Sequence, residues 1–531
     1  VAVKGIGGYH LMCDARNDNA VARLREKKPR PRKPLAVMFP WHGNDGLDAV
    51  RKVAVPNDEQ ARLLRDPMRP IVLVPKRASN GLSDQIAPGL NEIGCFLPYS
   101  PLHHLILDDF DGPLVATSGN ISGEPVLTDN SEADIRLRHV AEAFLHHNRP
   151  IARPADDPVY RIIAGAARPL RLGRGIAPLE LELPFTLAEP VLAVGGHMKN
   201  AVALAWNNRV VVSPHIGDLD APRSLAVFEQ IINDLQALYG VRAQRLVCDA
   251  HPGYASTRFA KKLRLPLTQV FHHHAHASAL AGEYPEVKNW LVFTWDGVGY
   301  GEDGTLWGGE ALLGMPGKWK RAASFRPFHL PGGEKAGREP WRSAAALCWE
   351  AGIEWKDCPE DTTILRQAWD KRLNAPQTSA VGRLFDAAAA LTGLNYKSSF
   401  EGQGPMLLEA AVNGDAKPVA LPLTADKNGV LRADWAPLLP MLMDANQIPS
   451  KRAAIFHASL AHALVEQAKA LRKKHGEFTV GFSGGVFQNR VLTECALALL
   501  AAAGFDIRLG QQIPCNDVGI SYGQIIEVSK R

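Results

Sequence analysis

Two hydrophobic patterns alternate along the first third of the chain and predict a mixed α/β domain. Short apolar runs at 70–74 and 113–117 have the length of buried strands, and another strand is expected at 1–4. The stretch 131–145 has the spacing of an amphipathic helix. Strands and helices that alternate up to about residue 182 are typical of this fold class.

The second half has a different order of predicted elements, with two β–turn–β units about a hundred residues apart. The first lies at 191–206 around a Gly-Gly pair, and the second at 290–313 around a glycine-rich turn at 297–304. Backbone N–H groups of such turns can approach phosphates closely. The repeat predicts a two-lobed architecture of the kind found in actin-like kinases and ATPases.

Other segments divide these halves. Prolines punctuate 178–190, which predicts a linker, and the helical pattern at 341–394 predicts an insertion in the second lobe. We therefore expect an α/β protein with a domain at 1–182 and a two-lobed domain at 188–531, with lobes of about 188–288 and 289–531.

Composition narrows the function classes. The 531 residues carry a net charge of +5, with 46% hydrophobic and 22% charged residues, as in ordinary globular proteins. So small a positive balance counts against a dedicated nucleic-acid binder, and no apolar run reaches the ~18 residues that span a bilayer. The seven cysteines contain no C-x-x-C pair, which fits a reducing cytoplasm. Because the chain begins at Val1 without Met, we expect a fragment of a longer protein.

A histidine cluster is the strongest chemical signal. If 271–283 is helical, His272 and His276 lie one turn apart on one face, where two imidazoles can hold one ion. A third ligand must come from elsewhere, and Asp517, in a turn before a glycine-containing helix, suits that role. The alternative is a set of core and surface histidines. Imidazole and carboxylate ligands suit iron or zinc.

The two remaining histidines of the cluster, His273 and His274, point away from that face. The sequence allows two interpretations of them. They either contact substrate or support the metal ligands, or they are surface residues.

Three glycine turns in the second half are candidates for phosphate binding. They are Gly195-Gly196, Asp296-Gly297 after an apolar strand, and Gly484-Gly485 before a helix that starts near Asn489. A strand–turn–helix unit places backbone N–H groups at a helix N-terminus, where anions bind. Ordinary hairpin turns are the alternative interpretation.

The first half combines cations with a hydroxyl- and amide-rich strand end at 117–123. Lysine and arginine at the mouth of a strand are good anion ligands, and the polar groups can hydrogen-bond a nucleotide or acyl phosphate. Solvated charges and turn caps are the alternative. The candidate ligands here are Lys4, Lys28, Arg30, Lys33, Ser118, Asn120 and Ser122.

These motifs resemble a known family over nearly the whole chain. The first domain resembles the YrdC/Sua5 type. The second resembles the Kae1/TsaD type of the actin-like ATPase superfamily, on His272-x-x-x-His276, residues 483–489 and Asp517. Their order in one chain, with the histidine cluster, resembles the HypF family of hydrogenase-maturation carbamoyltransferases. Members of that family also carry an acylphosphatase-like domain and a zinc-finger region, which we do not find in this sequence.

The resemblance implies a reaction. The YrdC-like domain would form carbamoyl-adenylate from ATP and carbamate derived from carbamoyl phosphate, with release of pyrophosphate. The intermediate would pass internally to the Kae1-like domain, which would transfer the carbamoyl group to the C-terminal cysteine of HypE, with release of AMP. ATP, Mg²⁺ and one iron or zinc ion are the implied cofactors, and HypE is the implied partner in the cytoplasm.

The resemblance also implies residue roles. Lys4, Lys28, Arg30, Lys33, His273 and His274 would be catalytic, and His272, His276 and Asp517 would hold the metal. The nucleotide would be bound by Ser118, Asn120, Ser122, Gly195, Gly196, Asp296, Gly297, Gly484, Gly485 and Asn489.

Three rival functions use related folds. A tRNA threonylcarbamoyladenosine enzyme should show a strongly basic face and salt-sensitive RNA binding. In small-molecule O-carbamoyltransferases the two domains occur in the opposite order. An actin-like nucleotide-binding module without transfer chemistry leaves the histidine cluster and the motifs of the first domain unexplained.

Overall fold

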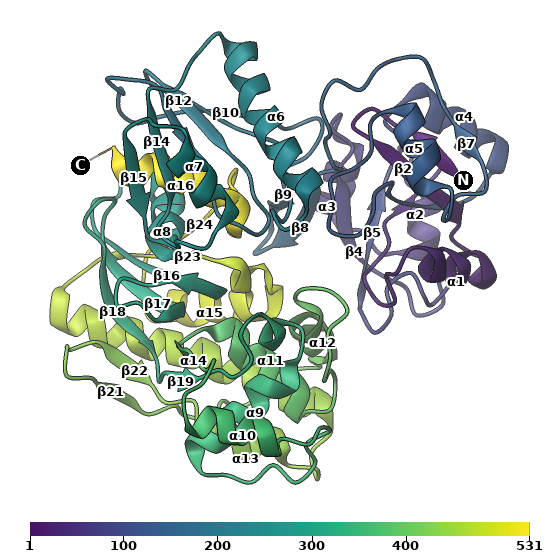
Figure 1. The fold of residues 1–531 in the computed structure, drawn as a ribbon. Coiled ribbons are helices and arrows are strands. Elements are labelled where there is room, and N and C mark those ends of the chain that lie inside the picture. Colours follow the sequence, from purple (N-terminus) through teal and green to yellow (C-terminus); the bar gives the residue numbers. More distant parts are fainter. Residues whose placement is uncertain (530–531) are drawn as a thin grey trace. The chain divides into compact units, whose positions relative to one another are not determined.

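The computed structural model describes residues 1–529, which form two compact units (Figure 1). The first unit comprises Val1–Cys248 and Gly253–Leu267, and the second comprises Asp249–Pro252 and the described residues from Thr268 onward. The sequence-based domain limits, 1–182 and 188–531, remain predictions.

The first unit opens with a mixed sheet and its helices. The strands are β1 (Ala2–Lys4), β2 (Tyr9–Asp14), β3 (Val37–Met38), β4 (Ile71–Pro75), β5 (Glu92–Phe96), β6 (Leu114–Ser118), β7 (Phe144–Leu145), β8 (Val159–Ile163) and β9 (Ala166–Arg171). The helices are α1 (Asp18–Lys27), α2 (Asp48–Val53), α3 (Asp58–Arg65), α4 (Pro101–Phe110) and α5 (Asn130–Leu137). The strands follow the order β7-β1-β2-β6-β3-β5-β4-β8-β9, and Met12, Met38 and Phe96 belong to the core.

The helix predicted at 131–145 is only partly correct. Helix α5 ends at Leu137, and the apolar pair Phe144–Leu145 forms β7, which pairs in parallel with β1. A sheet partner far away in sequence therefore decides the conformation of this pair, which the local pattern could not show.

A second sheet of the first unit follows. Its elements are β10 (Leu179–Glu182), β11 (Val191–Ala193), β12 (Ala203–Trp206), β13 (Arg209–Val212), β14 (Arg245–Asp249), α6 (Pro222–Tyr239) and α7 (Ala255–Lys262), and β15 (Leu267–Val270) runs into the second unit. Strands β10, β13, β12, β11 and β14 are successive neighbours. The segment 178–190, predicted as a linker, thus contains β10, whose Glu180 pairs with Val211 of β13.

The second unit contains a mixed sheet, several helices and the histidine segment. Its strands are β16 (Trp290–Tyr300), β17 (Leu306–Gly314), β18 (Lys320–Phe325), β19 (Phe328–His329), β20 (Gln377–Thr378), β21 (Leu423–Ala425), β22 (Leu431–Ala433), β23 (Thr479–Ser483) and β24 (Ile507–Leu509). Its helices are α8 (His272–Glu283), α9 (Pro340–Ala351), α10 (Thr363–Asp370), α11 (Val381–Leu391), α12 (Gln403–Ala411), α13 (Leu438–Met443), α14 (Pro449–His475), α15 (Arg490–Ala502) and α16 (Ile520–Val528). The main strand order is β21-β22-β18-β17-β16-β23-β24.

Strand β16 runs further than the sequence predicted. The expected turn at 297–304 begins inside the strand, because Gly299 and Tyr300 still pair with β17 beyond an irregularity in the ladder. By contrast, the helical region expected at 341–394 contains α9, α10 and α11.

Aromatic residues at the centre of this sheet form the core of the second unit. Phe293 and Trp295 of β16 are fully buried, and their ring centroids lie 6.0 Å apart. Phe482 of β23 and Phe487 stack at 4.5 Å in the same cluster. Among the described residues, no helix is both long enough and apolar enough to cross a membrane.

Replacing Phe293 with alanine should lower the free energy of unfolding of the second unit by about 3–5 kcal/mol, because it leaves a cavity in a closely packed aromatic core. Urea denaturation followed by tryptophan fluorescence measures the loss. The control Ile364→Ala removes a side chain that is 83% exposed, and should change stability by less than about 0.5 kcal/mol. A Phe293→Ala curve that superimposes on the wild-type curve would refute this account of the core.

Candidate functional site

Helix α8 carries the histidine cluster through the interior of the second unit. Its residues from His272 to Gly282 are all buried, as expected of a helix without a polar face. Small residues let α16 approach it closely: a Cβ added at Gly523 would lie 1.9 Å from the Ala275 carbonyl oxygen. This contact leaves α8 little freedom to slide or rotate, so the imidazoles hold fixed positions.

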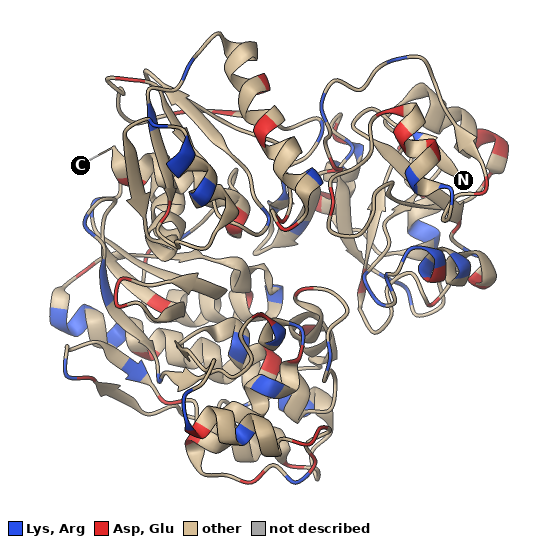
Figure 2. Ribbon diagram, viewed as in Figure 1, with Lys and Arg blue, Asp and Glu red and all other residues tan. Residues whose placement is uncertain are grey.

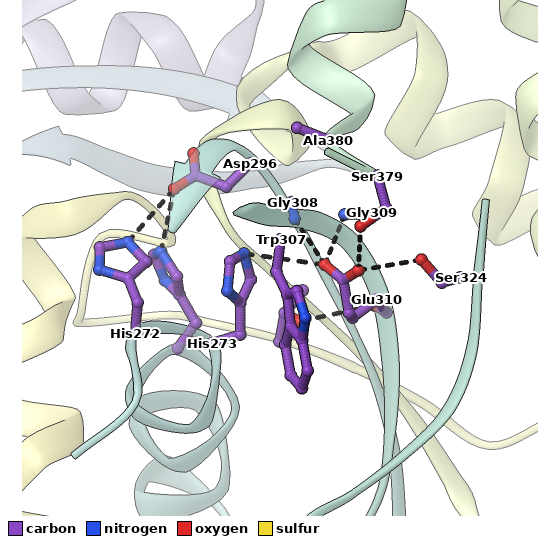
Figure 3. A network of polar contacts seen from close by, with 12 residues as sticks. His272, His273, Asp296, Trp307, Gly308, Gly309, Glu310, Ser324, Ser379 and Ala380 are labelled. Carbon is purple, nitrogen blue, oxygen red and sulfur yellow. Dashed lines mark hydrogen bonds and ion pairs between the residues drawn. The ribbon is translucent and has the colours of Figure 1, made fainter. Parts of the chain in front are cut away.

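Four potential ligand atoms converge at the N-terminal end of α8. His272, His276, Asp296 and Asp517 each offer one, and these atoms all lie within 4.8 Å of one another. Asp296 Oδ2 lies 3.4 Å from His272 Nε2 (Figure 3) and 3.4 Å from His276 Nε2. Asp517 Oδ1 lies 3.7 Å from His272 Nε2 and 3.6 Å from His276 Nε2. The spacing and donor types suit one transition-metal ion bound by nitrogen and oxygen.

A fifth residue orients the first imidazole. Asp249 Oδ2 lies 2.8 Å from His272 Nδ1, and both side chains are almost completely buried. A carboxylate on Nδ1 favours the tautomer that keeps its proton there and leaves Nε2 available as a ligand. His272 Nε2 is itself buried without a hydrogen-bond partner among the described residues, which fits a metal ligand.

The charges of this cluster also favour a cation. Burial by itself lowers the pKa of His272, but the nearby carboxylates of Asp249, Asp296 and Asp517 outweigh burial and raise the pKa well above its usual value. Burial likewise acts to raise the pKa of Asp296, and His272 and His276 pull it well below the usual range. One buried carboxylate, that of Asp249, and the two partly buried carboxylates of Asp296 and Asp517 thus face two imidazoles, and a metal ion would balance the excess negative charge.

From the sequence, Asp296 is predicted only to bind nucleotide, and no role is predicted for Asp249. Both stand at the carboxyl ends of apolar stretches, Asp249 as the last residue of β14 and Asp296 just after Trp295 in β16. Such strand-end carboxylates were the available signal, but only the folded chain shows that they reach the same histidines.

A glycine turn adjoins these ligands. Gly484 has φ +98°, and a Cβ there would lie 2.2 Å from the Trp295 carbonyl oxygen, so only glycine fits. Its N–H donates to the Cys515 carbonyl oxygen at 2.7 Å. The N–H of Gly485 donates to Asp296 Oδ1 at 3.2 Å. The turn therefore links the Asp296 strand to the loop that carries Asp517.

Other predicted site residues of the second unit have defined surroundings. Asn489 caps α15 by accepting from the Leu492 N–H at 2.9 Å, and its amide nitrogen lies 2.9 Å from His457 Nε2. Gly297 lies against α11, where a Cβ added at Gly382 would be 2.7 Å from the Gly297 Cα. Nucleotide binding by Asn489 and Gly297 remains a prediction.

His273 and His274 are buried, so the interpretation of them as surface residues is wrong. His273 Nε2 lies 4.0 Å from Glu310 Oε2, and His274 Nδ1 lies 3.9 Å from Glu527 Oε1. The tight packing of α8 on its neighbours buries all sides of the helix, which helical spacing alone could not predict. Their catalytic role remains a prediction.

In the first unit, the structure brings the predicted cations to one strand end. Lys28 Nζ donates to the Ser118 carbonyl oxygen and, at 2.7 Å, to Asn120 Oδ1. Arg30 donates to Thr117 Oγ1 at 2.5 Å. Partial desolvation, and then the positive charge of Arg30 and Arg171, lower the pKa of Lys33 to about 8, although the residue as a whole is exposed to solvent. Like charges held together in this way favour an anionic ligand.

The other predicted ligands of the first unit are more dispersed. Lys4 is buried and its Nζ donates to the His147 carbonyl oxygen at 3.1 Å, whereas Ser122 is exposed. The Gly196 carbonyl oxygen accepts from Asn200 at 2.7 Å and from Ser256 at 2.8 Å, and that of Gly195 accepts from Ser256 at 3.4 Å. Anion binding by these four residues remains a prediction.

Charges of both signs are interspersed along the helices and loops of each unit, as Figure 2 shows. This distribution agrees with the small net charge of +5. It differs from the single basic face that is typical of dedicated nucleic-acid binders.

Three family descriptions match successive parts of the chain. Residues 1–173 match the Sua5/YciO/YrdC family, described as "Telomere recombination". Residues 186–283 match "HypF Kae1-like domain", and residues 292–524 match "Carbamoyltransferase, Kae1-like Domain, second subdomain".

Curated relatives and solved structures match nearly the entire chain. It is 39% identical to "Carbamoyltransferase HypF" of Synechocystis sp. and 41% identical to that of Rhodobacter capsulatus, each time over 99% of this chain and 71% of the relative. A structure described as full-length HypF in the phosphate- and nucleotide-bound form superposes with a TM-score of 0.94 at 35% identity, covering 100% of this chain and 84% of that one. The predicted fold class, a YrdC-like domain followed by a Kae1-like domain, is confirmed.

Asp517→Ala and His272→Ala should each weaken Zn²⁺ binding by at least about 100-fold, because each removes one of few inward ligands. Competition with a chelating dye measures the affinity, and circular dichroism checks the fold. Asp361→Ala, which removes an exposed carboxylate of the same unit, is the matched control. Full Zn²⁺ affinity in the two ligand variants would contradict the assignment.

The pKa of Lys33 predicts a pH dependence for anion binding in the first unit. Below about pH 8 Lys33 is protonated and attracts an anion; as pH rises above 8, ATP affinity should fall by up to about tenfold per pH unit. Lys33→Arg keeps its charge and should flatten this profile, whereas Lys33→Ala should bind weakly throughout. Calorimetric titration from about pH 7 to about pH 9.5 tests this. Identical profiles for wild type and Lys33→Arg would contradict the role of Lys33.

Proposed function

The chain belongs to the HypF family of carbamoyltransferases, and from this membership we propose that it uses ATP to activate a carbamoyl group and transfers it to a cysteine thiol of a partner protein. The observation that carries the proposal is 36–41% identity to proteins named carbamoyltransferase HypF over 99% of the chain. The buried cluster of histidines and carboxylates supports it independently.

The first unit would perform the activation. Carbamate derived from carbamoyl phosphate attacks the α-phosphorus of ATP through an oxygen, which forms carbamoyl-adenylate and releases pyrophosphate. Lys28, Arg30 and Lys33 would hold the phosphates, and Ser118 and Asn120 would supply hydrogen bonds beside them. Carbamate alone is a poor electrophile. In carbamoyl-adenylate the carbamoyl carbon carries AMP as a good leaving group, which makes the later transfer possible.

The second unit would hold the activated intermediate for transfer. His272, His276, Asp296 and Asp517 would bind one iron or zinc ion, which when bound supplies positive charge beside the phosphate. Asp249 keeps His272 in the required tautomer, and the turn at Gly484-Gly485 offers a close backbone approach for the nucleotide. Mg²⁺ would accompany ATP.

The acceptor would be the C-terminal cysteine of a HypE-like protein in the cytoplasm. Its thiolate attacks the carbamoyl carbon, a C–S bond forms, the bond from that carbon to the phosphate oxygen breaks, and AMP leaves. This assignment rests on the membership in the HypF family. Of the rival functions, RNA-directed and small-molecule carbamoyl transfer are both less favoured, because the relatives that match 99% of the chain are named carbamoyltransferase HypF.

The full chain, incubated with ATP, Mg²⁺, carbamoyl phosphate and a peptide that ends in cysteine, should add about 43 Da to that peptide, the mass change when S–H becomes S–CONH₂. Mass spectrometry detects the adduct and its position. The same peptide ending in serine is the acceptor control, and Asp517→Ala is the enzyme control. Formation of AMP and pyrophosphate without a modified cysteine would contradict the proposed acceptor.

A further inference from the structure

Glu310 is a buried carboxylate beside the proposed metal site to which no function has been given. It stands on β17, is 0% exposed, and one of its oxygens accepts from the backbone N–H groups of Gly308 at 2.5 Å and Gly309 at 2.7 Å (Figure 3). Its other oxygen accepts from Arg321 at 2.8 Å, Ser324 at 2.9 Å and Ser379 at 2.5 Å. Five donors from three segments of the second unit thus converge on one side chain.

This complete set of hydrogen-bond donors indicates that Glu310 has a specific structural role. A buried carboxylate with its counter-charge gives little net stability compared with apolar packing of the same volume. Its usual benefit is geometric, because satisfied polar networks in the interior fix one backbone arrangement. Here the arrangement that it fixes is the conformation of Gly308 and Gly309.

These two glycines lie opposite an unusual part of β16. The ladder pairs Trp295 with Gly309 and next pairs Gly299 with Trp307, so that three residues, 296–298, face Gly308 alone. Asp296 is the first of the three. The regular sheet register therefore does not determine where Asp296 lies, in contrast to its neighbour Trp295.

Direct packing against Gly308 takes the place of the register. Gly308 has φ +158°, and a Cβ there would lie 2.8 Å from the Asp296 carbonyl oxygen and 2.7 Å from the Ala380 Cβ. The backbone at Gly308 thus lies in close contact with the backbone that carries the Asp296 carboxylate. A change in the Gly308 conformation would shift this carboxylate relative to His272 and His276.

We propose that Glu310 is a positioning residue that acts through Gly308 and Gly309 to hold Asp296 in place as a metal ligand. The proposal rests on the metal site of the proposed function. Glu310 acts on Asp296 through the backbone and not through the side chain of His273. His273 Nε2 is 4.0 Å from Glu310 and has no hydrogen-bond partner among the described residues. Arg321 supplies the counter-charge, and its other acidic partner, Asp303, lies toward the surface.

The test measures Zn²⁺ affinity of the full chain by chelator competition, together with thermal unfolding. Glu310→Ala should weaken Zn²⁺ binding by about 10–100-fold, the usual effect of losing a residue that orients a metal ligand. Glu310→Gln should lose less, because its amide oxygen can still accept from both glycine N–H groups. The control Asp303→Asn removes the surface partner of Arg321 and should bind Zn²⁺ as the wild type does.

A double-mutant cycle separates positioning from other effects. In an Asp296→Asn background, Glu310→Gln should change Zn²⁺ affinity by less than about twofold, since the ligand that it positions has been altered. A loss of charge that acted through space would persist in that background. If Glu310→Ala does not fold, the Glu310→Gln cycle decides.

Three results would overturn the inference. A folded Glu310→Gln variant with wild-type Zn²⁺ affinity, or an equal loss with and without Asp296→Asn, would show that Glu310 does not act through Asp296. Absence of Zn²⁺ binding by the wild-type chain would refute the metal site itself, and this inference with it.

Discussion

The second unit depends on concentrating carboxylates and imidazoles in its interior without leaving their charges uncompensated. Asp249, Asp296 and Asp517 surround His272 and His276, and all five side chains are buried or nearly so. Such a cluster is costly unless protons or a cation neutralise it. The protein forms it from four different segments: a helix packed on all sides, the end of β14, the irregularity within β16 and a loop hydrogen-bonded to a glycine turn.

The first unit also concentrates like charges, but there the charges are positive. Lys28, Arg30 and Lys33 come from one short segment, and the strand end at 117–120 accepts hydrogen bonds from Lys28 and Arg30. Partial desolvation and the neighbouring positive charges lower the pKa of Lys33, and an anionic ligand would raise it again. Each unit therefore holds an electrostatic imbalance that a ligand can relieve, a phosphate in one and a metal ion in the other.

Local sequence patterns predict those site residues whose relative position depends only on local geometry. His272 and His276 are four residues apart on a helix, and this spacing determines their neighbourhood before any tertiary contact is known. Asp517 was chosen for its turn and by family resemblance, and the structure places it within 3.7 Å of both imidazoles. Asp249 and the metal-facing role of Asp296 could not be predicted, because they depend on how the end of β14 and the irregularity within β16 lie relative to α8. Similarly, the burial of His274 and the pairing of β7 follow from contacts with partners distant in sequence.

The pairing of β10 with β13 has a consequence for how such a chain can be divided. The proline-marked segment resembles a tether, yet Leu179–Glu182 completes a sheet whose other strands come after residue 190. If the parts before and after residue 182 were produced separately, this strand would stay with the first part and β13 would be left with an unpaired edge that favours self-association. The connecting segment is therefore part of a sheet, and a separately produced second half would need a redesigned edge at β13.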